Sequence, residues 1–113
     1  MADIVVKAAY ATVADEDGLR YVGFVDALEE SYALFRQPVT GGPVWFEVND
    51  EDFGAEDAIL SAQFRDGSLE IALRPGVAGR FGYAQSVSIR LKSCEGGEAA
   101  LKALAGMTGL ALD

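Results

Sequence analysis

The stretch of this sequence that is best equipped for chemistry is residues 49–57, NDEDFGAED. Neighbouring carboxylates repel one another, so folding alone does not favour this composition. One aromatic residue, Phe53, lies among the acids. Four kinds of site would use such a stretch: a metal loop, a pair of catalytic acids, a surface for a basic partner, or a solvated turn. Its carboxylates are those of Asp50, Glu51, Asp52, Glu56 and Asp57.

A calcium loop of the EF-hand type is the first alternative, and the spacing does not match it. Such a loop needs oxygen ligands at its first, third and fifth positions and glycine at its sixth. With Asp50 in the first position, Asp52 fits the third, but Gly54 and Ala55 fall at the fifth and sixth. The sequence also predicts no flanking helices. We therefore expect no dedicated metal site, and weak binding of divalent cations stays open.

Catalytic groups are scarce elsewhere in the chain. It has no histidine, the usual general base near neutral pH, and its one cysteine, Cys94, cannot form a cysteine-rich zinc site. Glu47 is the best candidate acid, because it lies beside Trp45 in a predicted strand at 44–48, VWFEV. The alternation of that strand places Trp45, Glu47 and Asn49 on a half-exposed outer face, which explains them without catalysis. We expect no enzyme and no cofactor.

The charge of the chain limits its partners. The net charge is −9, and it is uneven: residues 1–60 carry 13 acids and 3 bases, whereas residues 61–113 carry 5 acids and 6 bases. Binding to DNA or RNA needs clustered Lys and Arg, so we expect no nucleic acid partner. An acidic face permits a basic protein partner, which long-range attraction would steer onto it. Solubility alone explains an acidic surface equally well.

Length and composition predict one cytoplasmic domain over residues 1–113. Half of the residues are hydrophobic, enough for one modest core. No apolar run reaches the roughly 18 residues of a membrane span, so no membrane contact is expected. The first residues, 1–18, lack the basic segment and the long apolar segment of a signal peptide. A single cysteine cannot form an internal disulfide, which fits a reducing compartment.

The elements that must position these residues are mostly strands, because short apolar stretches alternate with period two. Between the apolar stretches at 58–65 and 68–74, Asp66-Gly67 favours a type I′ turn, which predicts a tight hairpin over 58–74. Two prolines and two glycines predict a loop at 38–43. The segment at 76–82 is rich in glycine, which predicts a flexible connection. The strands are expected at 4–13, 19–25, 32–37, 44–48, 58–65, 68–74 and 85–92.

Only the end of the chain predicts a helix, at 97–107, with an apolar stripe that includes Ala100 and Leu104. The expected fold is α+β: a largely antiparallel sheet of about six or seven strands with one C-terminal helix. One helix covers only part of such a sheet. The remaining apolar face must curl on itself or find a partner, which favours a homodimer or a complex.

Acidic clusters recur at the expected strand ends, at 15–17, 26–30 and 49–57. If they gather on one rim, they form a negative patch with aromatic neighbours. Aromatic anchors ringed by charge are typical of an interface hot spot. Turns are also rich in Asp and Asn for local reasons, so solvated turns explain the clusters equally well. The neighbouring aromatic residues are Tyr32, Trp45 and Phe53.

Three strand motifs follow one another along the chain. The first ends in Gly-Phe-Val-Asp, the second opens on Tyr-Ala-Leu and ends in Arg-Gln, and the third is an aromatic pair leading into Glu-Val-Asn-Asp. Over roughly residues 19–105, this order resembles the Immunity protein 10 family of bacterial polymorphic-toxin systems. The motif residues are Gly23, Phe24, Val25 and Asp26; Tyr32, Leu34, Phe35, Arg36 and Gln37; and Trp45, Phe46, Glu47, Val48, Asn49 and Asp50.

The resemblance implies a small cytoplasmic protein that binds and neutralises a cognate toxin, without catalysis or a cofactor. An acidic inhibitor can cover the basic cleft of a nuclease toxin, with its carboxylates standing where substrate phosphates go. The alternatives that stay open are a self-associating structural domain, a small enzyme that uses Glu47, and a calcium-responsive module. The expected partner-binding residues are Tyr32, Trp45, Glu47, Asp50, Glu51, Asp52, Phe53, Glu56 and Asp57.

Overall fold

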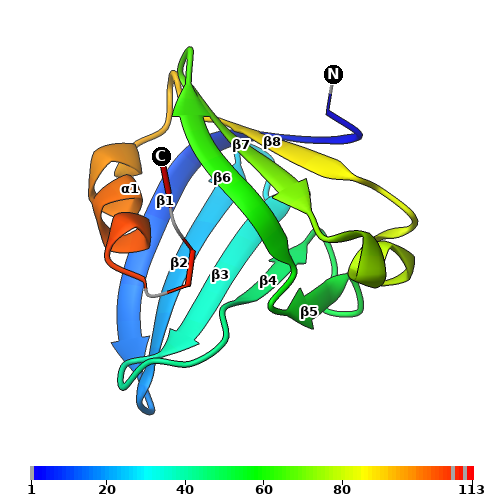
Figure 1. Cartoon of the computed structure of the whole chain (residues 1–113). Helices are drawn as coiled ribbons and strands as arrows, with labels where there is room; N and C mark the ends of the chain where they lie inside the picture. The colour runs from blue at the N-terminus through cyan, green and yellow to red at the C-terminus, as the bar shows by residue number, and fades with distance from the viewer. Residues whose placement is uncertain (1, 108, 111) are drawn as a thin grey trace.

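A computed structural model describes residues 2–107, 109–110 and 112–113, and it shows an α+β fold. Within these residues eight strands form one sheet in the order β5-β4-β3-β2-β1-β8-β7-β6 (Figure 1). The elements are β1 (Ile4–Glu16), β2 (Leu19–Asp26), β3 (Tyr32–Pro38), β4 (Trp45–Val48), β5 (Gly54–Glu56), β6 (Ile59–Arg65), β7 (Ser68–Leu73), the 3-10 helix η1 (Pro75–Phe81), β8 (Ser86–Arg90) and α1 (Gly97–Ala105).

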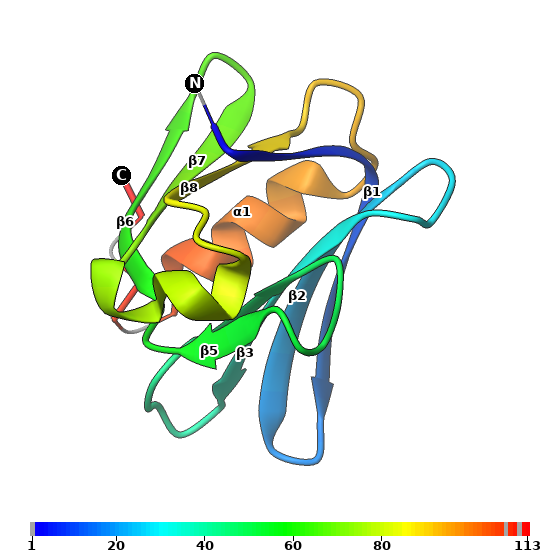
Figure 2. The same ribbon diagram turned by 90° about the vertical axis from the view of Figure 1, so that its right-hand side faces the viewer.

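The sheet curls so that its own strands cover its apolar face. The two edge strands, β5 and β6, are consecutive in the chain and are joined by only Asp57 and Ala58. The β6–β8 half therefore crosses over the β1–β5 half, and α1 packs beside β1 and β2 (Figures 1 and 2). Curling was one of the two outcomes expected for this face. It removes the reason for which a homodimer was favoured.

A row of aromatic rings crosses the core. Phe35 on β3 lies 6.1 Å from Phe24 on β2 and 4.8 Å from Phe46 on β4, measured between ring centroids. Phe46 in turn stacks on Phe81 of η1 at 5.9 Å. All four rings are buried. Ring contacts of this kind stabilise the fold beyond simple area burial, so this row ties η1 to the β2–β4 part of the sheet.

The type I′ turn predicted at Asp66-Gly67 is confirmed, and a second hairpin has the same turn geometry. Asp66 and Gly67, between β6 and β7, have φ angles of 54° and 78°. Asp17 and Gly18, between β1 and β2, have nearly the same angles, 52° and 77°. Positive φ at both central positions defines the type I′ turn, whose twist matches that of the flanking strands. The hairpin expected over 58–74 is therefore present, as β6 and β7.

The sheet differs from the expected one in two respects. It is mixed rather than antiparallel throughout, because β1 pairs with β8 in parallel. It also contains a strand that the sequence did not predict, β5, within the acidic stretch. A three-residue strand is too short to show a period, and a parallel pair between distant segments leaves no local signal.

The segments between the strands also differ from expectation. The connection expected to be flexible is the 3-10 helix η1, which is fixed by burial of Phe81. The final helix ends at Ala105, before Gly106. Leu60, an apolar residue in the strand expected at 58–65, is 56 % exposed, and a bulge between Ile59 and Ser61 shifts the register there. No helix among the described residues is long and apolar enough to cross a membrane.

The end of the chain protects one edge of the sheet. Asp113 donates its amide to the carbonyl of Ala62 at 3.0 Å and accepts from the amide of Phe64 at 3.0 Å. Leu112 also pairs with Ala62 in a parallel bridge. An unpaired edge strand is a template for pairing with another chain, so this segment blocks part of β6 from such contacts.

Candidate functional site

Two acidic turns lie side by side at one end of β3 and β4, and Asn49 joins them. The side-chain oxygen of Asn49 accepts hydrogen bonds from the Ser31 hydroxyl at 2.8 Å and from the Tyr32 amide at 2.9 Å. The Asn49 amide donates to the Tyr32 carbonyl at 3.0 Å. The turn after β2 and the turn after β4 are thus held together by hydrogen bonds.

Of the three acidic clusters in the sequence, two therefore meet and one does not. The cluster at 26–30 begins at the last residue of β2 and continues through the β2–β3 turn, and the first part of 49–57 lies in the β4–β5 turn. The cluster at 15–17 spans the end of β1 and the start of the β1–β2 turn, at the opposite end of β2 (Figure 2). There Asp15 pairs with Arg20 at 2.8 Å. A single rim that holds all three clusters is not formed.

We call the exposed side chains of the two joined turns the acidic patch. Its turns are shaped by two carboxylates that accept backbone amides: Asp26 from Glu30 and Asp50 from Asp52, both at 2.8 Å. Two apolar side chains are exposed beside the acids: Leu28 (76 %) and Phe53 (43 %). The patch consists of Leu28, Glu29, Glu30, Asp50, Glu51, Asp52 and Phe53.

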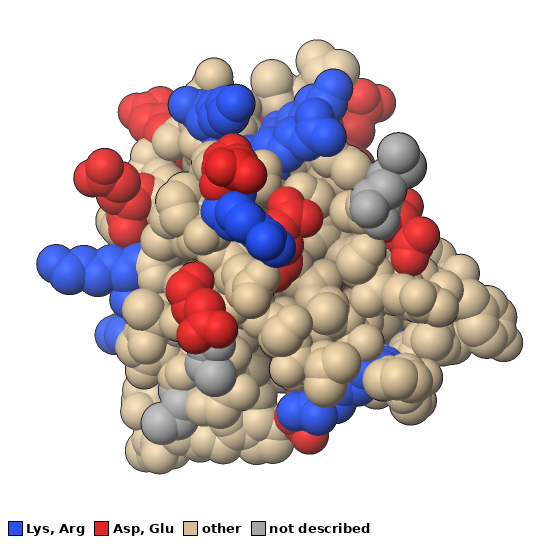
Figure 3. Space-filling view, turned by 45° about the horizontal axis from the view of Figure 1, so that its top comes forward, with Lys and Arg blue, Asp and Glu red and all other residues tan. Residues whose placement is uncertain are grey.

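The carboxylates of the patch face solvent without a basic partner. The ion pairs of the described residues are Asp15–Arg20 and Asp57–Arg74, the latter at 3.5 Å, and neither includes the patch. Figure 3 shows one face of the molecule, on which lysine and arginine side chains lie among carboxylates. The patch therefore combines two exposed apolar side chains with carboxylates that have no ion pair among the described residues.

Glu47, expected on a half-exposed outer face, is buried, with only 7 % of its surface exposed. Its carboxyl group accepts a hydrogen bond from the Tyr32 hydroxyl at 2.5 Å and another from the Trp45 indole nitrogen at 2.7 Å. A buried polar group must find such partners, because leaving it unpaired would cost free energy. Glu47 therefore fixes the orientation of two half-buried aromatic rings and is itself covered by them.

The Trp45 ring has a second set of contacts that hold it flat against the sheet. Gly54, opposite Glu47 in the β4–β5 register, leaves room for the indole: an added Cβ there would lie 2.5 Å from Trp45 Cζ2. On another side the Arg36 guanidinium lies 5.0 Å from the ring centroid, within the range of a cation–π contact. Trp45 is thereby presented as a rigid aromatic surface next to the acidic turns.

The electrostatics of Tyr32 connect this aromatic cluster with the patch. Burial, followed by the hydrogen bond to Glu47 and its charge, raises the pKa of the Tyr32 phenol above its ordinary value. The charges of Asp50 and Glu51 add to the increase. Tyr32 is therefore close enough to the patch to experience its negative potential.

Replacing Tyr32 by Phe tests this hydrogen bond. Tyr32→Phe removes one donor to the buried carboxyl group of Glu47, so we expect the free energy of unfolding to fall by about 1 to 3 kcal/mol. Urea unfolding at neutral pH measures the loss. Tyr83→Phe is the matched control, because the Tyr83 side chain is largely exposed and should lose little. Equal losses in the two variants would contradict the structural role of Tyr32.

Comparison of the wild type with Tyr32→Phe also tests the raised pKa of the Tyr32 phenol. Because the folded state holds the Tyr32 proton more tightly than the unfolded chain, the contribution of the phenol is complete below its ordinary pKa of 10.0. It is lost as the pH rises above that value. The stability difference between the wild type and Tyr32→Phe should therefore shrink between about pH 8 and about pH 11. A difference that grows over this interval would contradict the prediction.

The nine residues expected to bind a partner thus divide into three groups. Tyr32, Trp45 and Glu47 form the hydrogen-bonded cluster beside the patch. Glu56 and Asp57 form the second group, outside the patch. Glu56 lies in β5 in register with Trp45, and Asp57 forms an ion pair with Arg74. Leu28 was not singled out from the sequence, because an isolated leucine in a turn carries no periodic signal. The four that belong to the patch are Asp50, Glu51, Asp52 and Phe53.

Metal and thiol chemistry find no support in the described part of the chain. There, no three Asp, Glu or Cys side chains converge in a way that could hold a metal ion. Burial raises the pKa of the Cys94 thiol. A reactive cysteine needs the opposite shift, since the thiolate is the nucleophile.

Comparison of the chain with known protein families, characterised proteins and solved structures finds no match. The resemblance to the Immunity protein 10 family therefore rests on its strand motifs. In the structure these motifs, at 23–26, 32–37 and 45–50, lie on the neighbouring strands β2, β3 and β4. The first ends where one acidic turn begins, and the third leads into the other turn. The motif segments are thus the ones that form and support the acidic patch.

Proposed function

We propose that this protein is a non-catalytic immunity protein, which binds a cognate toxin through the acidic patch and neutralises it. The observation that carries the proposal is the joining of two acidic turns by Asn49, with exposed Leu28 and Phe53 among carboxylates that have no basic partner. Exposed apolar side chains among carboxylates without an ion pair do little for folding. It suits a partner that brings both positive charge and an apolar contact.

The physical properties of the patch fit recognition of a basic protein. Uncompensated carboxylates attract a basic partner over long range and so accelerate its association. Apolar side chains ringed by charge become the desolvated centre of an interface, where most of the binding energy is concentrated. Hydrogen bonds of Asn49, Asp26 and Asp50 fix the turns before binding, so less conformational entropy is lost on association.

A nuclease domain is the toxin class that best fits this chemistry. Nucleases bind the phosphates of their substrate through clustered Lys and Arg. The carboxylates of the patch would take the positions of those phosphates and cover the cleft. The protein would then inhibit by occupying the site, which requires no catalytic group of its own.

Removing charge from the patch is the test. The variant D50N/E51Q/D52N keeps the side-chain oxygen that caps the turn but removes three negative charges. Against the partner that the wild type binds, we expect association at low salt to slow by roughly tenfold or more, with a weaker dependence on salt. The variant D15N/E16Q/D17N removes the same charge from the opposite end of β2 and should slow association much less. Equal slowing by both variants would contradict the proposed location of the interface.

Neutralisation is tested separately from binding. Expression of the partner's toxic domain should arrest growth, and co-expression of the wild-type protein should restore it. The patch variant should restore growth poorly, whereas the variant with the altered β1–β2 turn should restore it as well as the wild type. Binding without any protection would leave a protein-binding module and contradict the immunity function.

A further inference from the structure

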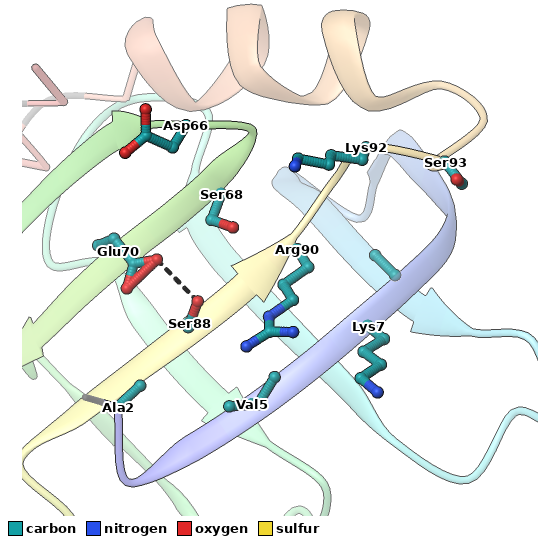
Figure 4. A pocket seen from close by; sticks show the side chains of 11 residues that line it. Ala2, Val5, Lys7, Asp66, Ser68, Glu70, Ser88, Arg90, Lys92 and Ser93 are labelled. Carbon is teal, nitrogen blue, oxygen red and sulfur yellow. Dashed lines mark hydrogen bonds between the residues drawn. The ribbon is translucent and has the colours of Figure 1, made fainter.

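A polar hollow of about 590 Å³ lies on the outer face of β1, β8 and β7, away from the acidic patch (Figure 4). Its volume is within the range of roughly 300 to 1,000 Å³ that is common for small-molecule sites. Basic side chains line one side of it, and carboxylates and hydroxyls line the other. In this strongly acidic protein, such a concentration of cations calls for an explanation.

The cations of the hollow are placed where folding does not favour them. Lys7 on β1 and Arg90 on β8 are register partners in the parallel pair, and like charges side by side on neighbouring strands are destabilising. Lys92 follows two residues after Arg90, and its stem lies against the backbone of Gly67, where an added Cβ would be 2.8 Å from Lys92 Cγ. None of the three has an ion pair among the described residues.

The Glu70 carboxylate of the hollow is offset from Lys7 and Arg90. Glu70 on β7 is in register with Ser88, from whose hydroxyl it accepts a hydrogen bond at 2.7 Å, whereas Arg90 is in register with Ser68. In Figure 4, Lys7 and Arg90 lie on one side of Ser88 and Glu70 lies on the other. The hollow therefore presents a cationic half along β8 and β1 and a half rich in hydrogen-bond acceptors along β7.

We propose that this hollow binds a small phosphorylated polyol, such as a sugar phosphate. The Arg90 guanidinium can bind phosphate oxygens in pairs, and Lys7 and Lys92 add positive charge around them. Glu70 can accept hydrogen bonds from the hydroxyls of the ligand, since an ionised carboxylate is an acceptor only. The nearby carboxylates and the net charge of −9 disfavour an extended nucleic acid in the same place.

Titration of the isotopically labelled protein with glucose 6-phosphate, glucose and inorganic phosphate, followed by NMR, tests the site. Glucose 6-phosphate should shift the amide signals of Lys7, Ser88 and Arg90 in a saturable way, and glucose should not. Arg90→Gln should weaken glucose 6-phosphate binding by roughly tenfold, the value of one strong charged hydrogen bond. Glu70→Gln should weaken the binding of glucose 6-phosphate more than the binding of inorganic phosphate. Lys102→Gln, on α1, is the control that should change neither.

Several results would overturn the proposal. One is the absence of shifts at these amides with glucose 6-phosphate, and another is unchanged affinity in Arg90→Gln. Inorganic phosphate that binds as tightly as glucose 6-phosphate would show an adventitious ion site only. If Arg90→Gln does not fold, Lys7→Gln is used in its place. The variant D50N/E51Q/D52N should bind glucose 6-phosphate normally, so this test is independent of the toxin-binding proposal.

Discussion

Phe46→Ala is expected to lower the free energy of unfolding by about 3 to 5 kcal/mol, the usual cost of truncating a buried phenylalanine. Phe46 has no exposed surface, and its ring contacts Phe35 on one side and Phe81 on the other, with centroids 4.8 and 5.9 Å away. Its loss interrupts the aromatic row that ties η1 to β3 and β4. The remaining cavity cannot collapse easily, because rigid neighbouring strands line it. Urea unfolding followed by circular dichroism measures the loss.

Phe53→Ala is the matched control for this prediction. The Phe53 side chain is 43 % exposed and belongs to the acidic patch, so its truncation should cost less than about 1 kcal/mol. The same variant should weaken partner binding if Phe53 is an anchor of the interface. A cost for Phe46→Ala no larger than that for Phe53→Ala would contradict the packing described for the core.

Gly54→Ala is expected to disturb the aromatic cluster beside the patch and to destabilise the protein by about 1 to 3 kcal/mol, as overpacking usually does. The added methyl group would lie 2.5 Å from Trp45 Cζ2 and 2.8 Å from Glu47 Cβ, so the indole must move. Movement of the indole breaks its hydrogen bond to Glu47 and its contact with Arg36. Trp45 is the one tryptophan of the chain, so its fluorescence reports the change directly.

Gly76→Ala provides the comparison, because an added Cβ at Gly76 would meet no atom within 4 Å. This variant should keep both the stability and the tryptophan emission of the wild type. Gly54→Ala should shift the emission to longer wavelength as the indole becomes more exposed. An unchanged emission spectrum together with unchanged stability would show that the Trp45 ring does not lie over Gly54.

Much of the sheet is predictable because its strands alternate with period two. The stretches that became β7 and β8 bury Leu69, Ile71, Val87 and Ile89, as the pattern predicts. The curl of the sheet is not predictable in the same way. It depends on a parallel pair between β1 and β8 and on the two-residue link from β5 to β6, which are properties of the whole chain.

The candidate site shows the same division between local and non-local information. The sequence marks Asp50, Glu51, Asp52 and Phe53 by composition alone. It does not show that Asn49 would bring the turn around Leu28 to them, because that depends on hydrogen bonds across two strands. Nor does the alternation of β4 predict the burial of Glu47, which requires partners on β3 and the space left by Gly54 on β5.

The central claim is that the acidic patch recognises a basic toxin, and parallel affinity capture tests it most directly. Three baits are compared in lysate of the native cells at low and at high salt: the wild type, D50N/E51Q/D52N and D15N/E16Q/D17N. We expect the wild type and the D15N/E16Q/D17N bait to retain the same basic, toxin-like partner at low salt, as identified by mass spectrometry. The patch variant should lose it, and high salt should weaken the capture. Equal retention of that partner by the patch variant, or no partner with any bait, would contradict the claim.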